Sequence, residues 1–486
     1  MTARGERTDG GGSVRGRWAL VVAIVGLLLP SCTPTNDTPP DARAEPSGTA
    51  VDRPNIVLIV TDDQRWDTLG SMPATQRLLM GPGVTFRNAF VVNPLCCPSR
   101  ASILTGGYSH TTGVYRNGGE YGPRAFDDTS TLGTWLDAAG YRTGLVGKWM
   151  NTYRDLSYVP PGWDRWVGMR SSHAVYYDYA LSVDGDGRSF GSKPSDYSTD
   201  VLAGFAERFV RSTEEDTPLF MLVTPTAPHG PRLPAPRHEG LVDRSGIRPG
   251  PNVAESDVSD KPRYIRSLPL DGPELERAMR EWRDRQVATL RAVDDLVRRV
   301  VLALRDTGRL QNTLIVLTSD NGLAFGEHRW TYKLTPYEES IRVPMVMRYD
   351  PATSGTHSGA IALNIDLAPT IGDLARVTIP AADGESLLPV IDGTRRGVRN
   401  SFLIEHLRDQ RDGRRPDPPT YCGLRTERAL FVRYQTGEEE LYDLASDPFQ
   451  LRNLVEEPGS REQLRDLRRR TRSMCRPVPP GFSWDP

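Results

Sequence analysis

Residues 55–63 have the sequence Asn-Ile-Val-Leu-Ile-Val-Thr-Asp-Asp, and this stretch decides the fold that we expect for the 486-residue chain. The run from Asn55 to Thr61 is apolar at every internal position, which is typical of a strand buried on both faces of a parallel sheet. It ends in Asp62 and Asp63, and open α/β sheets bind their ligands at the carboxyl ends of strands. An Asp-Asp pair can also cap a helix in a loop, so this pair alone does not define a site.

A second apolar run repeats the pattern and strengthens the argument. Residues 313–318 are followed by Ser319-Asp320-Asn321-Gly322. Together with Asp62 and Asp63, Asp320 and Asn321 offer hard oxygen ligands, which suit Ca²⁺ or Mg²⁺ and suit zinc poorly. Further strands are predicted at 141–149 and 218–224, and a long amphipathic helix from 271 to about 308. The expected fold class is α/β.

Between the two runs, residues 93–106 have the sequence Asn-Pro-Leu-Cys-Cys-Pro-Ser-Arg-Ala-Ser-Ile-Leu-Thr-Gly. Pro98 fits the first turn of a helix, which places Cys96 and Cys97 at the helix entrance, with free backbone N–H groups and the positive end of the dipole. Arg100 adds a fixed charge that favours a bound anion. From the residues alone, Cys96 is a nucleophile candidate in an anion-binding turn. The alternative is a buried thiol pair before an ordinary helix.

The pattern Cys96-x-Pro98-Ser99-Arg100, followed by Leu-Thr-Gly, resembles the signature of the sulfatase family. This resemblance implies that a separate formylglycine-generating enzyme oxidises Cys96 to formylglycine, while Cys97 occupies a variable position. It implies an alkaline-phosphatase-like fold, with a large, mostly parallel central sheet flanked by helices and a smaller C-terminal antiparallel subdomain. It also implies one Ca²⁺, held by an oxygen of residue 96 and by Asp62, Asp63, Asp320 and Asn321.

The resemblance assigns further roles at the site. Lys148, in Gly-Lys-Trp, and Lys333 match sulfate-binding lysines, and Arg100 would steady the aldehyde hydrate. His229, in Ala-Pro-His, would donate a proton or hydrogen bond to the leaving-group oxygen. Taken singly, such a lysine is more often a surface charge and such a histidine structural. His328 either reaches the substrate or caps a loop.

A narrower resemblance concerns the substrate. Met150 stands where many sulfatases have a histidine. Asn151, Tyr153 and His110 are therefore left as candidates for the group that takes the proton when the covalent hemiacetal on residue 96 breaks down. Residues 147–153 and 160–163 resemble N-acetylglucosamine-6-sulfatases and heparan 6-O-endosulfatases, and imply a 6-O-sulfated glucosamine glycan.

Several alternatives stay open at this point. The substrate could be an aryl sulfate or another sulfated sugar, the reaction could be phosphomonoester or phosphonate-ester hydrolysis on the same scaffold, and the chain could be an inactive surface glycan binder. The aromatic stretch 176–183, a predicted strand, could stack on sugar rings or pack in the core. The loop 232–268 is expected to shape the substrate entrance.

The two ends of the chain carry separate signals. Arginines, an apolar run at 18–29 and Leu29-Pro30-Ser31-Cys32 predict a signal peptide over 1–31. The sequence Leu29-Pro30-Ser31-Cys32 resembles a bacterial lipoprotein box, with Cys32 as the lipid-bearing residue and 32–50 as a tether. An ordinary cleaved signal is the alternative. The catalytic domain is expected at 51–400 and the C-terminal subdomain at 401–486, in a protein exported to the cell surface or secreted.

The net charge and the remaining cysteines limit the possible partners and cross-links. Lysine and arginine number 60 against 62 acidic residues, a net charge of -2, which offers no general attraction for nucleic acid. In the arginine-rich stretch 461–472, Glu462 and Asp466 favour a solvated helix face over a polyanion site. Cys422 and Cys475 either form a disulfide that pins the C-terminal tail or are two free buried thiols.

Overall fold

The structure is a computed structural model that describes residues 53–171, 176–242, 250–270, 272–409 and 417–485. The predicted signal peptide, Cys32 and most of the tether region lie outside these residues, as does part of the loop 232–268. Among the described residues, no helix combines the length and the apolar composition needed to cross a membrane.

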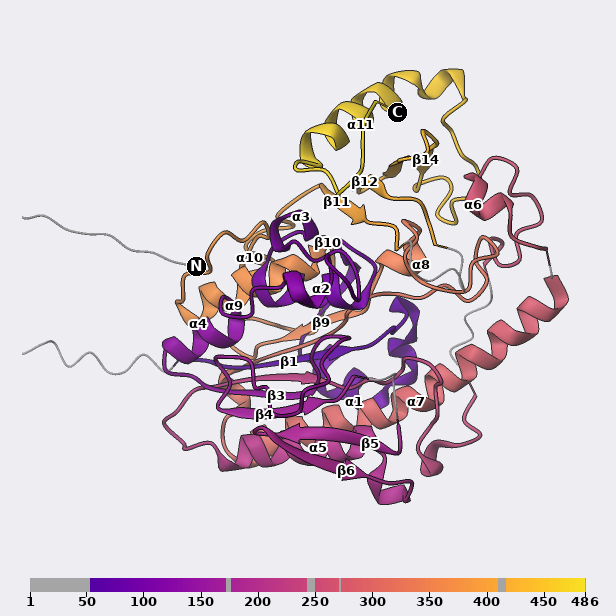
Figure 1. Ribbon diagram of the computed structural model, residues 1–486. Helices are drawn as coiled ribbons and strands as arrows, with labels where there is room; N and C mark the ends of the chain where they lie inside the picture. The colour runs from indigo at the N-terminus through magenta and orange to yellow at the C-terminus, as the bar shows by residue number, and fades with distance from the viewer. Residues whose placement is uncertain (1–52, 172–175, 243–249, 271, 410–416, 486) are drawn as a thin grey trace, which may run out of the picture. The chain divides into compact units, whose positions relative to one another are not determined.

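A ten-stranded sheet forms the centre of the structure (Figure 1). Its order is β10-β2-β9-β8-β1-β7-β3-β4-β5-β6, and β8, β1, β7, β3 and β4 run parallel. The prediction of a large, mostly parallel sheet is therefore confirmed. Its strands are β1 (Asn55–Thr61), β2 (Val84–Phe90), β3 (Arg142–Lys148), β4 (Arg165–Met169), β5 (Tyr179–Val183), β6 (Asp186–Phe190), β7 (Leu219–Thr224), β8 (Thr313–Ser319), β9 (Met345–Arg348) and β10 (Thr356–Leu363).

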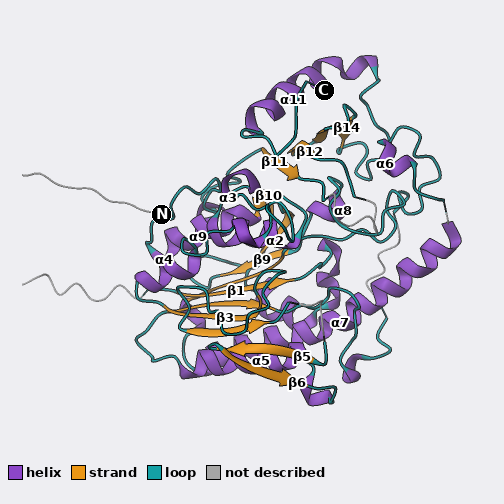
Figure 2. Cartoon of the chain, viewed as in Figure 1, coloured by secondary structure: helices purple, strands orange, loops and turns teal. Residues whose placement is uncertain are grey.

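Helices cover both faces of this sheet (Figure 2). Val57 and Ile59 of β1 pack with α5 and α7 on one face, while Ile56, Leu58 and Val60 pack with α2, α4 and α9 on the other. All five side chains are buried, as the uninterrupted apolar run predicts. The helices are α1 (Pro73–Thr75), α2 (Cys96–Thr105), α3 (Ser109–Thr112), α4 (Leu132–Ala138), α5 (Ser198–Ser212), α6 (Arg263–Arg266), α7 (Gly272–Asp306), α8 (Glu338–Ile341), α9 (Leu367–Ala375), α10 (Leu388–Ile391) and α11 (Arg461–Met474).

A second, four-stranded antiparallel sheet follows in the chain, with β11 (Ser401–His406), β12 (Tyr421–Thr426), β13 (Ala429–Tyr434) and β14 (Glu439–Asp443) in sequence order. Leu464 and Leu467 of α11 pack against its apolar side chains. A disulfide joins Cys422 of β12 to Cys475, just after α11. The smaller antiparallel sheet is thus confirmed, while the domain boundary at residue 400 stays a prediction.

The aromatic stretch at 176–183 differs from the prediction. Only Tyr179–Val183 is a strand, because Asp178 adopts a left-handed backbone conformation with φ 53° that interrupts the extended run. Tyr176 and Tyr179 are 1% and 5% exposed and belong to apolar cores. These two tyrosines therefore pack inside the protein and offer no surface for stacking on sugars.

Gly147 determines how closely β3 approaches β7. It pairs with Thr224 and has φ +128°, a conformation that side chains rarely adopt. A Cβ atom at this position would overlap the backbone carbonyl of Thr224. The glycine therefore lets the two strands meet just before Lys148 leaves the sheet.

We expect Gly147→Ala to lower the free energy of unfolding by about 2–4 kcal/mol, because it adds backbone strain to a steric overlap. Chemical denaturation of both proteins measures the difference. Gly359→Ala is the matched control, since a Cβ there meets no atom within 4 Å, and should change stability by less than about 0.5 kcal/mol. Equal stability of the two variants would contradict this account of the β3–β7 contact.

Candidate functional site

The two aspartate-bearing strand ends lie side by side. β1 and β8 pair in parallel register from Asn55↔Thr313 to Thr61↔Ser319, so Asp62 and Asp63 emerge next to Asp320 and Asn321. The backbone N–H of Asp63 donates to Oδ1 of Asp320 over 3.2 Å. All four side chains are buried. The structure thus brings together the predicted metal ligands from two distant parts of the chain.

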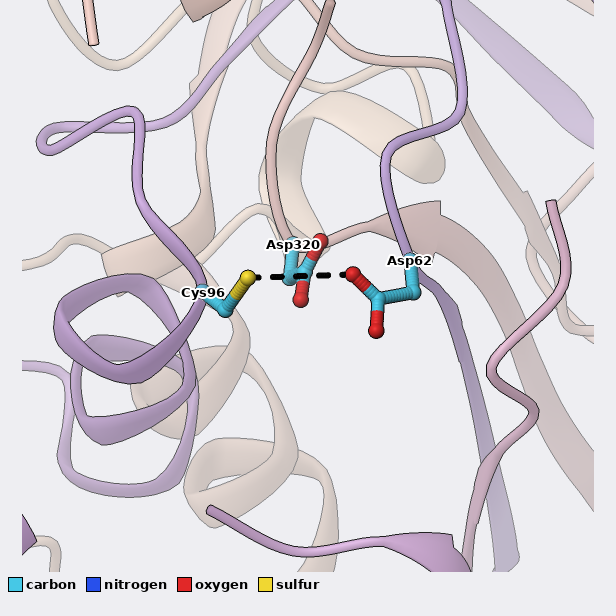
Figure 3. A group of neighbouring side chains, drawn as sticks. All are labelled: Asp62, Cys96 and Asp320. Atoms are coloured by element: carbon cyan, nitrogen blue, oxygen red, sulfur yellow. Dashed lines mark hydrogen bonds between the residues drawn. The ribbon is translucent and has the colours of Figure 1, made fainter. Parts of the chain in front are cut away.

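Cys96 is the first residue of α2, and its side chain points to the same place. Its Sγ lies 3.7 Å from Oδ1 of Asp62, with Asp320 beside them (Figure 3). Pro98 lies in the first helical turn, as predicted. The expectation of free backbone donors is only partly met, because the N–H of Cys97 donates to Oδ1 of Asn117 over 2.9 Å.

Three cations, the buried Arg100 and Lys333 and the partly exposed Lys148, offset the three carboxylates. Nε of Arg100 lies 2.9 Å from Oδ2 of Asp320, and Nζ of Lys148 lies 2.6 Å from Oδ2 of Asp62. Lys333 donates to Asp63, and its Nζ is 2.9 Å from the Sγ of Cys96. Each carboxylate therefore has a cation of its own, which lowers the cost of burying the charges.

His229 stands at the edge of this cluster. Its Nε2 lies 3.5 Å from Oδ2 of Asp63, and its Nδ1 lies 2.8 Å from the carbonyl oxygen of Gly230. A carbonyl only accepts, so Nδ1 carries the hydrogen and Nε2 is the atom that can exchange a proton at the site. The side chains of His229 and Lys148 are 29% and 12% exposed. These two residues mark the side from which a ligand reaches the cluster.

The surroundings shift the pKa values of the acidic groups in opposite directions. Burial would raise the pKa of Asp62, but Lys148 and the other nearby cations outweigh burial and hold that pKa far below its usual value. Lys333 has the same effect on Asp63. Burial and the charge of Asp62 raise the pKa of Asp320.

Burial also changes the two thiols. It raises the pKa of Cys96 despite the neighbouring lysines, and raises that of Cys97 to about 12. An unmodified Cys96 is therefore a protonated thiol at neutral pH and a poor nucleophile.

The donor set fits a hard divalent cation. Ligand atoms of Asp62, Cys96 and Asp320 lie within 4.8 Å of one another, as do those of Asp62, Asp63 and His229. The carboxylates and the Asn321 amide oxygen are the ligands that Ca²⁺ takes in proteins. Arg100 and the two lysines already balance the three carboxylates, so a bound divalent ion would leave the centre with a positive charge that attracts an anion.

Of the candidate proton acceptors, only Asn151 adjoins the cysteine pair, since its N–H lies 3.1 Å from Sγ of Cys97. Tyr153 donates its hydroxyl hydrogen to the carbonyl of Tyr158, and Nδ1 of His110 pairs with Glu405. His328 is fully buried, with its Nδ1 2.6 Å from Oε2 of Glu255. This contact supports the loop-capping role for His328 rather than contact with a ligand.

Arg232 is a residue that sequence reasoning missed. Its backbone N–H donates to the carbonyl of His229 over 3.3 Å, and its guanidinium lies 5.0 Å from the ring centroid of Phe325. Its Nε is buried and has no hydrogen-bond partner among the described residues. The available signal was an arginine three positions after His229 in a proline-rich loop.

Comparisons with known proteins agree with this geometry. The family model described as Sulfatase matches residues 54–377. A second model, described as N-sulphoglucosamine sulphohydrolase, C-terminal, matches residues 326–476. The first match alone contains every residue of the cluster described above.

Two similar proteins carry related names. Human N-acetylglucosamine-6-sulfatase is 33% identical over 451 residues, which cover 83% of this chain and 81% of the human protein. The extracellular sulfatase SULF-1 homolog of Drosophila melanogaster is 36% identical over 368 residues, which cover 73% of this chain but only 33% of the fly protein.

Solved structures share the fold. A structure of a protein in complex with its substrate D-glucosamine-2-N,6-O-disulfate superimposes with a TM-score of 0.76 at 26% identity, covering 87% of this chain and 97% of that one. The phosphonate monoester hydrolase of Agrobacterium radiobacter gives 0.68 at 22% identity, covering 86% and 96%. The second likeness concerns the fold alone.

We expect Lys333→Met to lower the free energy of unfolding by roughly 3–5 kcal/mol at pH 7 in the presence of a chelator, because it leaves Asp63 buried without its cation. In the parent, the lowered pKa of Asp63 adds stability above about pH 4 that is lost as pH falls through the folded-state value. The difference between parent and variant should therefore shrink below about pH 4, as urea titrations at several pH values would measure. Lys193→Met, at an exposed lysine, is the control. A pH-independent difference would contradict the pairing.

Proposed function

The chain belongs to the sulfatase family, and from this membership we propose that it desulfates glycans with a formylglycine at position 96 and one Ca²⁺. As a member of the family it is an enzyme that hydrolyses sulfate esters. The observation that carries the proposal is the meeting of Cys96 with Asp62 and Asp320 (Figure 3), beside Lys148 and Lys333.

Formylglycine at position 96 would supply an aldehyde hydrate as nucleophile, and Ca²⁺ held by Asp62, Asp63, Asp320 and Asn321 would supply charge stabilisation. The proposed modification would also supply a nucleophile that the thiol does not, because burial raises the pKa of Cys96 and keeps the thiol protonated at neutral pH. Support for a shared ion comes from the ligand atoms of Asp62, which lie within 4.8 Å of those of both Asp320 and Asp63, and from Asn321, whose side chain contacts Asp63.

The remaining residues position the ester and its charges. Sulfuryl transfer, like phosphoryl transfer, needs mainly alignment and charge stabilisation. Lys148 and Lys333 would bind the sulfate oxygens, since both ammonium groups lie within the cluster. Arg100, paired with Asp320, would steady the hydrate. His229 would hold a proton at Nε2 for the departing alcohol oxygen, which suits its place on the accessible side.

The proposed substrate is a 6-O-sulfated N-acetylglucosamine or a related sulfated glycan. Support comes from the human N-acetylglucosamine-6-sulfatase and from the Bacteroides thetaiotaomicron N-acetylglucosamine-6-O-sulfatase, which is 27% identical over 505 residues covering 90% of this chain and 86% of that protein. The names of the extracellular relatives support export of this chain. Anchoring through a lipid on Cys32 is a further part of the proposal.

Phosphomonoester or phosphonate-ester hydrolysis is the competing reaction on the same scaffold, since a phosphonate monoester hydrolase shares the fold. The ratio of hydrolysis rates on matched sulfate and phosphate esters separates the two reactions. An inactive glycan binder is disfavoured because the whole cluster of candidate residues is assembled.

The modification can be tested directly. Mass spectrometry of the peptide that contains residue 96, from protein produced in its native host, should find the aldehyde in place of the thiol. Cys96→Ala should lower kcat/KM on N-acetylglucosamine 6-sulfate by about 10³-fold or more, because it removes the nucleophile. Cys97→Ala, which alters the neighbouring thiol, should lose less than about tenfold. An unmodified thiol in fully active protein would overturn the proposal.

The metal can be tested by removal and by substitution. A chelator should abolish activity, and added Ca²⁺ should restore it. Asp320→Asn should weaken the apparent affinity for Ca²⁺ by at least about tenfold, because it removes a charged ligand. Asp295→Asn is the control, since that carboxylate pairs with Arg237 and His238 on the surface. Activity that is unaffected by exhaustive chelation would contradict a metal-dependent site.

A further inference from the structure

We propose that a basic pocket on the C-terminal sheet binds sulfated glycan chains at a second site, separate from the catalytic cluster. The pocket has a volume of about 640 Å³, within the range of sites that hold small ligands. It shares no residue with the catalytic cluster. Its lining consists of Arg433, Glu439, Arg468, Arg469, Arg472, Ser473, Arg476 and Trp484.

Three separate segments build this pocket. Arg433 and Glu439 come from the paired strands β13 and β14. Helix α11, which lies against the small sheet (Figure 1), adds Arg468, Arg469, Arg472 and Ser473. The C-terminal tail adds Arg476 and Trp484. The disulfide between Cys422 and Cys475 ties the end of α11 to β12 immediately before Arg476. The pocket is therefore assembled by tertiary structure and held in place by a covalent link.

Ion pairs fix several of the arginine side chains in the pocket, and an excess of positive charge remains. Both carboxylate oxygens of Glu439 lie 3.0 Å from Nε of Arg468, and Glu439 also pairs with Arg433. Arg472 pairs with Asp485 over 3.3 Å. Arg476 has no ion-pair partner among the described residues, and the five arginines of the lining outnumber the three carboxylates that pair with them, those of Glu439, Asp466 and Asp485. Guanidinium groups retain N–H donors after one such pairing, so these can bind a further anion.

The chemistry favours a sulfated sugar chain as the ligand. Several guanidinium groups match several oxyanions on one molecule, and the partly buried Trp484 offers an aromatic surface for a sugar ring. The net charge of the whole chain is -2, so the attraction comes from this pocket rather than from a general basic character. The choice of a sulfated glycan over another polyanion rests on the proposed function.

The structure changes the interpretation of the arginine-rich stretch. In the sequence, Glu462 and Asp466 favoured a solvated helix face. Asp466 does pair with Arg470 and with Arg469, of which Arg469 also lines the pocket. Arg468 and Arg472, however, share a pocket with Arg433 and Arg476, which the sequence places in other segments. Only the fold brings these charges together.

The test measures binding rather than turnover, so its result can be interpreted even if the proposed sulfatase activity is not found. The probe is a size-defined heparin-derived octasaccharide, titrated calorimetrically into the full chain. We expect the double variant Arg472→Ala/Arg476→Ala to bind it about tenfold or more weakly than the parent, because two charge-assisted contacts are lost. Arg461→Ala/Arg465→Ala removes the same number of charges from a part of α11 outside the pocket, and should change affinity less than about threefold.

Each further outcome decides the question. Equal losses in the two double variants, or no loss in either, would overturn the proposal. Tighter binding of phosphatidylglycerol vesicles or of a single-stranded oligonucleotide than of the octasaccharide, lost in the same variant, would overturn the assignment to a glycan. If the alanine variant fails to fold, Arg472→Lys/Arg476→Lys keeps the charge but removes the guanidinium fork, and should still weaken binding several-fold.

Discussion

The parallel pairing of β1 with β8 is the constraint on which the site depends. It places Asp62 and Asp63 beside Asp320 and Asn321 in the interior of the protein, where unpaired carboxylates would be strongly destabilising. Arg100 from α2, Lys148 from β3 and Lys333 from a loop then supply the compensating charges. Five separate parts of the chain are thus tied to one centre by electrostatics as well as by packing.

The smaller sheet contributes to this centre without entering it. The loop that carries Lys333 is fixed by two hydrogen bonds, from Nε1 of Trp330 to the carbonyl of Lys333 and from the hydroxyl of Tyr421 in β12 to the carbonyl of Leu334, each 2.8 Å long. Nearby, the buried carboxylate of Glu440 in β14 accepts hydrogen bonds from Tyr337 and Tyr442. The C-terminal sheet therefore helps to fix the position of Lys333 in the buried cluster.

Sequence reasoning succeeded where a signal lies within one continuous segment. The apolar runs that become β1, β7 and β8, and the amphipathic period of α7, are such signals, and the polar residues that follow the strands could be read as site candidates. It failed where tertiary contacts decide. The left-handed backbone at Asp178, the packing of Arg232 against Phe325 and the assembly of the arginine pocket all depend on neighbours outside the local segment. The sequence alone also could not identify which group acts as proton acceptor in place of the histidine that many sulfatases have at the position of Met150.

The burial of Cys96 has a consequence for the order of events during biosynthesis. Only 1% of this side chain is exposed, and Asp320 and Lys333, which enclose it, are synthesised long after it. Another enzyme cannot reach such a side chain in the finished protein. The oxidation that we propose at this position must therefore occur on the nascent or unfolded chain, before β8 docks against β1. Folding then encloses residue 96, and a chain that completes its fold before the oxidation would keep an enclosed thiol at that position.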